Sequence, residues 1–155
     1  SNRGVFRPST RGVGAGCWVS GVNAALETFR WPIRVYYEDT DAGGIVYYAN
    51  YLRFMERART EWLQARGVDV AELAGQARLM FTVREIHLDF LRAARLSDNL
   101  EVSVGVKRAR RVSVELEQSV TLAGELLCTA QVRLACVDVD TLKPRPIPDG
   151  ILKEI

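Results

Sequence analysis

The first regular pattern in the chain is an alternation of apolar and other residues that begins at Phe29. Its alternate positions are Trp31, Ile33, Val35 and Tyr37. A period of two residues predicts a β-strand with one face toward a core. Pro32 has no backbone N–H to donate to a neighbouring strand. The strand is therefore expected at the edge of a sheet, or with Pro32 at its beginning.

The spacing of apolar residues changes to that of a helix between residues 49 and 66. The residues that repeat at helical spacing are Tyr51, Met55, Ala58, Trp62 and Ala65. Charged side chains mostly occupy the other faces, so this segment is predicted to be an amphipathic helix with one buried face. Gly67 is the expected C-terminal stop, and a shorter helix is predicted over residues 69–77.

Four more strands are predicted in succession in the second half of the chain. Apolar positions alternate over residues 81–90, 100–106, 112–122 and 130–136. The phase of the first of these strands changes near Arg84 and Glu85, which predicts a β-bulge. Short polar links at residues 107–111 and 123–125 predict hairpins, so these strands should be antiparallel neighbours.

The order of strand, long helix and four strands favours an α+β fold, in which one curved antiparallel sheet wraps around one apolar-faced helix. The outer sheet face, with Gln118, Gln131 and several arginines, is expected to meet solvent or another subunit. Residues 28–155 are thus predicted to form one domain. Residues 1–27 hold five glycines without a sustained period, and we expect them to be a loosely ordered tail rather than a targeting segment.

Composition excludes few classes of protein. The chain has 155 residues, 48% of them hydrophobic, and a formal net charge of +2. These values are typical of a globular domain, and the charge is too small to indicate nucleic acid or a membrane surface as a partner. No apolar run has the roughly 18 residues that a membrane-spanning helix needs. Cys17, Cys128 and Cys136 lack metal-ligand spacing, and the last two are expected to be small buried side chains in a reducing cytoplasm.

Three carboxylates, Glu38, Asp39 and Asp41, stand within four residues after the first predicted strand. Consecutive side chains of an extended chain point to opposite faces, which argues against a shared metal ion. Gly43 and Gly44 allow the backbone to approach a ligand closely, and the start of the next helix offers free N–H groups for an oxyanion. Asp41 is therefore the favoured nucleophile or general base for an acyl group, and the alternative is a solvated acidic turn.

A second charged feature lies at the first predicted hairpin. Its four cations are Lys107, Arg108, Arg110 and Arg111. Such groups suit phosphate oxygens, so a phosphate-binding patch and a solvated turn are both open interpretations. No aromatic residues interleave, which disfavours nucleic acid. The single histidine, His87, is expected on the surface or at an interface, on the same side as Glu85 and Asp89.

Residues 34–61, which read RVYYEDTDAGGIVYYANYLRFMERARTE, resemble the signature of the 4-hydroxybenzoyl-CoA thioesterase family. They are most similar to the branch of acyl-CoA thioesterases encoded beside the Tol–Pal envelope system of Gram-negative bacteria. The resemblance extends over about residues 29–155 and includes residues 88–96 and 143–148. It implies the hotdog fold, a five-stranded antiparallel sheet around a long central helix. It also implies dimers that assemble into tetramers, with active sites at the subunit interface.

The same resemblance implies roles for individual residues. Asp41 is the expected catalytic carboxylate, and the backbone N–H of Tyr48 is expected to polarise the thioester carbonyl. The expected substrate-binding residues are Gly44, Val46, Tyr51 and Glu56, and the expected CoA-phosphate ligands are Lys107, Arg108, Arg110 and Arg111. Tyr48 stands where the Tol–Pal branch usually has histidine, which keeps the N–H role but removes an imidazole.

The implied reaction is hydrolysis of an acyl-CoA thioester to a free acid and CoA, without a metal and without a cofactor other than the CoA of the substrate. Two alternatives stay open: hydrolysis of acyl groups on an acyl carrier protein, and a scaffold of the envelope system that binds acyl-CoA or partner proteins without turnover. A hotdog dehydratase is disfavoured, because that chemistry ordinarily needs a catalytic histidine and His87 lies outside the motif.

Overall fold

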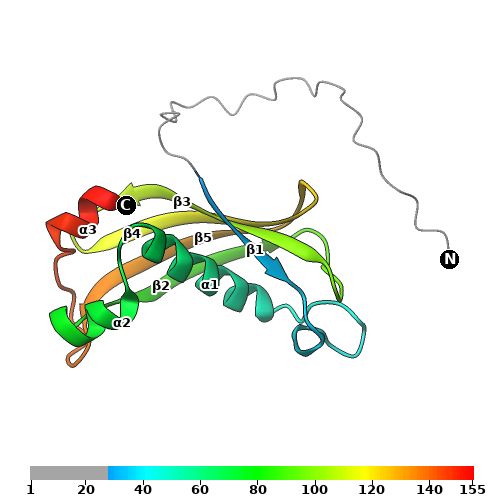
Figure 1. Ribbon diagram of the computed structural model, residues 1–155, viewed down its shortest axis with the longest axis horizontal. Helices are drawn as coiled ribbons and strands as arrows, with labels where there is room; N and C mark the ends of the chain where they lie inside the picture. Colours follow the sequence, from blue (N-terminus) through cyan, green and yellow to red (C-terminus); the bar gives the residue numbers. More distant parts are fainter. Residues whose placement is uncertain (1–27) are drawn as a thin grey trace, which may run out of the picture.

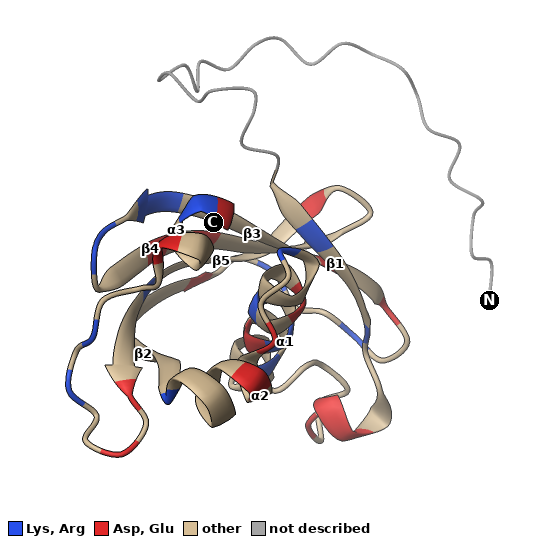
Figure 2. Ribbon diagram, turned by 60° about the vertical axis from the view of Figure 1, so that its left-hand side comes forward, with Lys and Arg blue, Asp and Glu red and all other residues tan. Residues whose placement is uncertain are grey.

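The computed structural model describes residues 28–155, which form a single curved sheet with a long helix in its hollow (Figure 1). The five strands are antiparallel and lie in the order β1-β3-β4-β5-β2. Their bounds are β1 Phe29–Arg34, β2 Leu79–Phe90, β3 Asn99–Ala109, β4 Ser113–Leu122 and β5 Glu125–Asp138. Figure 2 shows how the strands curve around the long helix α1. The predicted α+β arrangement of one sheet around one helix is confirmed.

The long helix lies where the apolar pattern predicts it. The first strand begins as predicted but is shorter, because it ends at Arg34 and Tyr37 belongs to the short helix η1. Among the described strands, β1 pairs only with β3 and forms one edge of the sheet, as the position of Pro32 indicated. The helix α1 spans Asn50–Ala65, and Gly67 follows it with a positive φ of 77°. A left-handed backbone after the last turn is the usual way in which a glycine ends a helix.

The other helical segments are short. They are η1 Tyr37–Asp39, α2 Val70–Glu72, η2 Leu73–Ala77 and α3 Asp149–Glu154. The predicted helix over residues 69–77 is present, but its second half, η2, has π-helical geometry. Asp69 caps its start, since its carboxylate accepts the N–H groups of Ala71 and Glu72. Among the described helices, none is long and apolar enough to cross a membrane.

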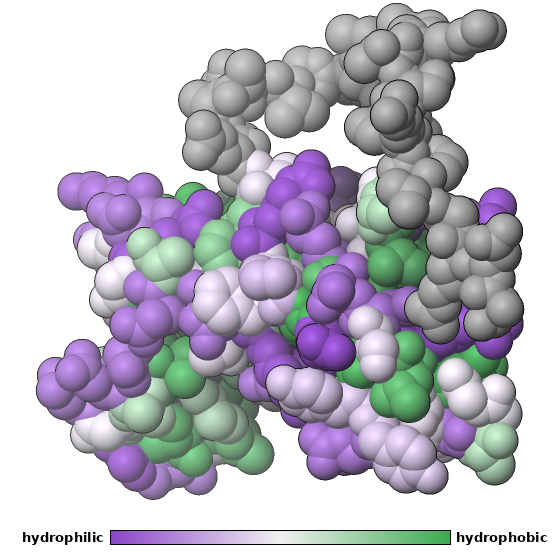
Figure 3. Space-filling model, turned by 45° about the vertical axis from the view of Figure 1, so that its right-hand side comes forward, coloured by the Kyte–Doolittle hydropathy of each residue, from purple (hydrophilic) through white to green (hydrophobic). Residues whose placement is uncertain are grey.

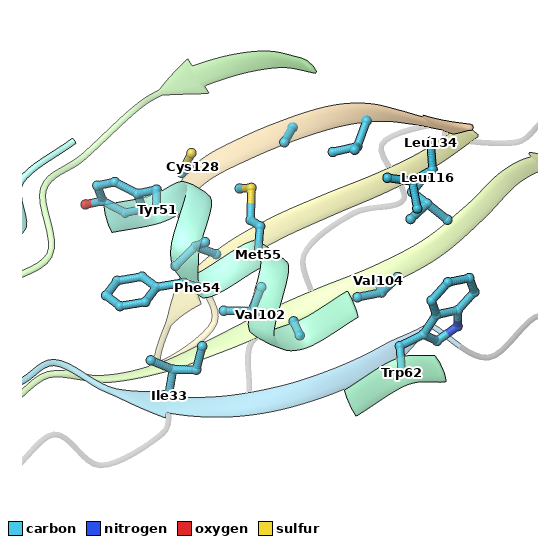
Figure 4. Packing of buried hydrophobic residues seen from close by; sticks show 14 of the residues in the cluster. Ile33, Tyr51, Phe54, Met55, Trp62, Val102, Val104, Leu116, Cys128 and Leu134 are labelled. Atoms are coloured by element: carbon cyan, nitrogen blue, oxygen red, sulfur yellow. The ribbon is translucent and has the colours of Figure 1, made fainter. Parts of the chain in front are cut away.

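The core fills the space between α1 and the inner face of the sheet (Figure 4). From the helix, Phe54, Met55 and Trp62 are almost fully buried, and Val104 and Leu116 face them from β3 and β4. Burying a side chain of this size stabilises a fold by about 1.5–3 kcal/mol relative to leaving it exposed. The packing therefore holds α1 firmly against the sheet.

Gln118 corrects one prediction. It was expected on the outer face, but only 3% of it is exposed, and it lies on the inner face between Leu116 and Val120. Its Nε2 donates to the carbonyl of Met55 at 3.2 Å, and its Oε1 accepts from Nη1 of Arg59 at 2.9 Å. Burial of an amide is tolerated when hydrogen bonds replace those to water, and Gln118 meets this condition.

The remaining strand predictions hold with small changes. Gln131 is exposed on the outer face as expected, and the register of β2 shifts between Val83 and Glu85, which confirms the predicted bulge. The first hairpin turn is shorter than the predicted 107–111, because β3 continues to Ala109 and β4 begins at Ser113. Lys107 and Arg108, the first two cations of the predicted turn, thus belong to β3.

The cysteine and histidine predictions are confirmed within residues 28–155. Cys128 and Cys136 are buried, and their thiols are free rather than joined in a disulfide bond. His87 is exposed on β2, with its Nε2 2.9 Å from a carboxylate oxygen of Glu85. Cys17 and the predicted tail, residues 1–27, lie outside the described residues.

Candidate active site

The segment between β1 and α1 folds into a tight turn that holds Asp41. The Asp41 N–H donates to the carbonyl of Ile45 at 2.9 Å, and the N–H of Gly44 donates back to the Asp41 carbonyl at 3.0 Å. One carboxylate oxygen, Oδ1, accepts the N–H of Gly43 at 2.8 Å. The other, Oδ2, has no hydrogen-bond donor among residues 28–155, and Asp41 is exposed. The backbone of the turn is fixed while one carboxylate oxygen stays available.

The two glycines of the turn are there for different reasons. Gly44 has a φ of 74°, in the left-handed region that costs other residues about 1–2 kcal/mol. Gly43 has an ordinary φ, but a Cβ at this position would lie 3.1 Å from Oδ1 of Asp41. Gly43 therefore makes room for the carboxylate, and Gly44 makes the turn itself possible.

The other two carboxylates of the motif do not converge with Asp41. Asp39 is buried, and its Oδ2 accepts the N–H of Tyr36 at 2.8 Å, which stabilises the short helix η1. Glu38 is exposed. Within residues 28–155, no three His, Cys, Asp or Glu side chains are grouped so that they could hold a metal ion.

The start of α1 supplies unpaired N–H groups next to this turn. The residue before the helix is Ala49, which has no side-chain acceptor, and the helix has no side-chain cap. Alanine at this position costs about 1 kcal/mol relative to a capping Ser, Thr, Asp or Asn. Among the described residues, neither the N–H of Tyr48 nor that of Ala49 has an acceptor. These donors are free to bind an oxyanion.

Aromatic side chains surround the helix start. The ring of Tyr48 is 63% exposed and lies edge-on to Phe90 at the end of β2, with 6.3 Å between the ring centroids. Phe90 is itself 49% exposed, and its other ring neighbour is Tyr51 at 5.6 Å. Hydrophobic and hydrophilic residues are intermixed on the face of the molecule that Figure 3 shows. A substrate that lies against the helix start would thus meet aromatic surface.

Three of the four expected substrate-binding residues lie together, and the fourth lies apart from them. Gly44, Val46 and Tyr51 lie together around the turn and the helix start, and the last two are buried. The hydroxyl of Tyr51 accepts the N–H of Ala94 at 3.0 Å, and burial raises the pKa of this phenol. Glu56 instead lies exposed on the surface of α1, where it accepts a hydrogen bond from Thr60.

The four expected phosphate ligands lie far from Asp41 within one protomer. Leu100 on β3 pairs with Ile33, at the end of β1 that leads into the Asp41 turn. Arg108 lies eight residues further along the same strand. At about 3.3 Å per residue, the hairpin is separated from the turn by roughly 25 Å. The two features that sequence analysis singled out are thus at opposite ends of the sheet.

Three residues of the site were missed by sequence analysis. The carbonyl of Ala94 accepts the N–H of Val46 at 2.8 Å and so anchors the turn. The side chain of Asn50 donates to the carbonyl of Asp39 at 2.8 Å. The ring of Phe90 packs against that of Tyr48. The polar side chain of Asn50 on the buried start of an amphipathic helix was a usable signal. Ala94 acts through its backbone, which no residue type reveals.

The fold and the site match known proteins of one class. The model of the thioesterase-like superfamily matches residues 35–155. The chain belongs to this superfamily, and the expected hotdog fold and the expected class of enzyme, a thioester hydrolase, are confirmed.

Individual relatives are similar over most of their length. An acyl-CoA thioester hydrolase named YbgC from Escherichia coli O6:H1 (strain CFT073) is 43% identical over 127 residues, which cover 81% of this chain and 94% of that protein. An acyl-CoA thioesterase named YbgC from Haemophilus influenzae is 42% identical over 123 residues, 79% of this chain and 90% of that protein. Among solved structures, a probable thioesterase from Bartonella henselae has a TM-score of 0.76 at 33% identity, and the match covers 79% of this chain and 100% of that chain.

Proposed function

We propose that the protein hydrolyses acyl-CoA thioesters to a free carboxylic acid and CoA, with Asp41 as the catalytic carboxylate. The observation that carries this proposal is the pairing of a free Asp41 oxygen with the unpaired N–H groups of Tyr48 and Ala49 on one short loop. The curated relatives named as acyl-CoA thioesterases support the choice of CoA as the carrier.

The chemistry follows from this pairing. The thioester oxygen accepts the N–H of Tyr48, and the charge that develops on it is stabilised there by about 3 kcal/mol, a typical value for one oxyanion donor. Asp41 then either attacks the carbonyl carbon, which expels the thiolate of CoA and leaves the acyl group as a mixed anhydride on Asp41 that water cleaves, or it removes a proton from the water that attacks. Both routes consume one water and release the acid and the thiol of CoA.

The site is proposed to be completed by a second subunit. Tyr48 and Phe90 are both about half exposed or more in one protomer, and β2 is an unpaired edge of the sheet among the described residues. A dimer that covers this surface would give the acyl group a second wall, and the tetramer implied by the family resemblance would be a pair of such dimers. Since the basic hairpin lies far from Asp41 in its own protomer, it would meet the phosphates of CoA bound mainly to another subunit.

The biological setting is proposed from the resemblance. The motif of residues 34–61 supports a place in the Tol–Pal-associated branch, and the buried free thiols of Cys128 and Cys136 suit a reducing cytoplasm. Tyr48, in place of the usual histidine of that branch, adds aromatic surface at the site. The chain length or aryl character of the acyl group is therefore best determined by assay.

The test is release of free thiol from short, long, branched and aryl acyl-CoA substrates by wild type and by Asp41→Asn. Removing a general base typically lowers a rate by about a hundredfold to ten-thousandfold, and we expect a loss in this range in kcat for the best substrate. An unchanged rate in Asp41→Asn would exclude Asp41 as the catalytic group. Absence of thiol release across the whole panel by wild type would favour a binding scaffold instead.

A second candidate substrate is an acyl group on an acyl carrier protein. The exposed cations Arg108, Arg110 and Arg111 have no carboxylate partner among residues 28–155, and such a patch suits an acidic protein. The same acyl group presented on CoA and on the carrier protein separates the two. Equal kcat/KM for both carriers would argue against a dedicated carrier-protein enzyme.

A further inference from the structure

We infer that the first two residues of α1, Asn50 and Tyr51, are positioning residues that hold the helix start at a fixed place relative to Asp41. The inference rests on the proposed function, because it concerns the geometry of the same site. The side chains of Asn50 and Tyr51 act on the reaction through hydrogen bonds to the backbone of neighbouring segments. Neither of these bonds involves a substrate atom.

The first tie joins the helix to the segment that enters the Asp41 turn. Asn50 is only 7% exposed, and its Nδ2 donates to the carbonyl oxygen of Asp39 at 2.8 Å. The same carbonyl accepts the N–H of Tyr47 at 3.0 Å. Asp39 is itself held by its carboxylate, which accepts the N–H of Tyr36. The chain two residues before Asp41 is therefore bound to the helix start from a buried side chain.

The second tie joins the helix to the segment that leaves the turn. The hydroxyl of Tyr51 accepts the N–H of Ala94 at 3.0 Å, and the carbonyl of Ala94 accepts the N–H of Val46 at 2.8 Å. Val46 in turn forms a β-bridge with Thr40, which lies next to Asp41. Tyr51 and Val46 are both buried, so water does not compete for these bonds.

The two ties enter the turn from both sides, and neither of them uses the free N–H donors of the helix start. The N-cap position is occupied by Ala49, the side chain of Asn50 is directed to Asp39, and α1 has no side-chain cap. The helix keeps its free donors while its position is fixed by the loop. Misplacing a reacting group by about 1 Å can cost a factor of about a hundred in rate, so such ties bear directly on catalysis.

The experiment compares Tyr51→Phe and Asn50→Leu with wild type in the thiol-release assay on the best acyl-CoA substrate. Each variant removes one tie and keeps the size of the side chain. We expect kcat to fall about tenfold in each, with KM changed by less than about twofold, because geometry rather than substrate binding is lost. The double variant should lose more than the product of the two single effects, since one tie restrains the turn when the other is absent.

A matched control separates positioning from general loss of stability. Val114→Ala removes two methyl groups from the core on β4, beside Leu134 and away from the Asp41 turn. It should lower Tm as much as or more than Tyr51→Phe does and leave kcat unchanged. Hydrogen exchange gives a second readout: the amide of Val46, one step beyond the deleted hydroxyl, should exchange faster in Tyr51→Phe and not in Val114→Ala.

The outcomes for this inference and for the proposed function differ. If Tyr51→Phe and Asn50→Leu keep kcat within about twofold of wild type while Asp41→Asn is inactive, the ties do not position the site and the proposed function stands. A parallel loss of kcat in Val114→Ala at equal Tm would also overturn the inference. If Asp41→Asn retains the full rate, the proposed function fails and the inference fails with it.

Discussion

The Asp41 turn and the basic hairpin, which carries Lys107, Arg108, Arg110 and Arg111, are both short charged segments next to a strand. They differ in the contacts that hold their residues in place. The turn is fixed by backbone bonds among its own residues and by side chains from α1. The hairpin projects from the far end of β3, and three of its four cations have no ion-pair partner within residues 28–155. Two of its residues, Arg110 and Arg111, border an open hollow of about 520 Å³ beside α3.

The contrast indicates which kind of role each segment suits. Chemistry on a carbonyl group needs groups held within a fraction of an ångström, which the turn provides. Attraction of a phosphate or an acidic partner acts over several ångströms and needs only exposed cations, which the hairpin provides. Changes in the turn should therefore act on kcat, and changes in the hairpin should act on KM.

The largest effect after loss of Asp41 itself is expected from its glycines. Gly44→Ala places a Cβ on a left-handed backbone with a φ of 74°, and Gly43→Ala places one 3.1 Å from Oδ1 of Asp41. Either change displaces the carboxylate, so kcat should fall by up to about a hundredfold. Thiol-release kinetics measure this, with Tm recorded for both variants.

Gly124 offers a matched control for Gly44. It also has a positive φ, 82°, but lies in the turn between β4 and β5. Gly124→Ala should lose a similar amount of stability, about 1–2 kcal/mol for a left-handed alanine, and keep its kcat. Equal loss of activity in both variants would mean that strain alone, and not the position of Asp41, governs the rate.

A smaller effect is expected from the hairpin. Replacing Arg108, Arg110 and Arg111 together by alanine should raise KM for acyl-CoA by about tenfold at low salt and leave kcat unchanged, because only the attraction of phosphate is lost. The difference from wild type should shrink as salt is added. Arg30→Ala, which removes an exposed cation of β1 that is paired with Glu101, is the control. An unchanged KM in the triple variant would rule out the hairpin as the phosphate site.

The smallest effect is expected from Cys128, a buried thiol on β5. Burial raises the pKa of the Cys128 thiol to about 11, and Tyr51 lies beside it. The folded protein keeps this proton to higher pH than the unfolded chain does. The stability that results is present below the usual thiol pKa near 9 and is lost as pH rises toward 11. We expect Tm to fall by a few degrees over this interval.

Thermal unfolding at pH 8, 9, 10 and 11 checks this expectation, with Cys128→Ala as the comparison. The variant has no thiol to ionise at this position, so its Tm should decline less over the same interval. If both proteins decline equally, groups other than Cys128 determine the loss. The basic hairpin, with no buried titratable group, should make no such contribution.

Much of the fold could be predicted because the evidence for it is local. The period of two residues marked the strands, the change of phase near Arg84 marked the bulge, and Gly67 marked the end of α1. Gln118 shows the limit of residue type as a guide. Its position has the same parity as Leu116 and Val120, and that parity was a better indicator of its buried face than its polar side chain.

The candidate site was predictable in part. Asp41, the glycines and the helix start lie within one short segment, so their proximity follows from the chain itself. The relation of this segment to the basic hairpin did not follow, because the direction and length of β3 separate the two. The sequence placed the polar Asn50 at the buried start of the helix, but it did not reveal that the partner of its side chain is the carbonyl of Asp39.

Residue patterns alone indicated the strands, the long helix and the superfamily, and they supported Asp41 as the proposed catalytic carboxylate, because periodicity and a contiguous motif are properties of neighbouring residues. How Asp41 is held depends on the tertiary structure. The bond between Tyr51 and Ala94 joins positions 43 apart in the chain, and it exists because the sheet curves around α1 and brings the end of β2 to the helix start. Contacts of this kind depend on packing, which no local pattern of residues specifies.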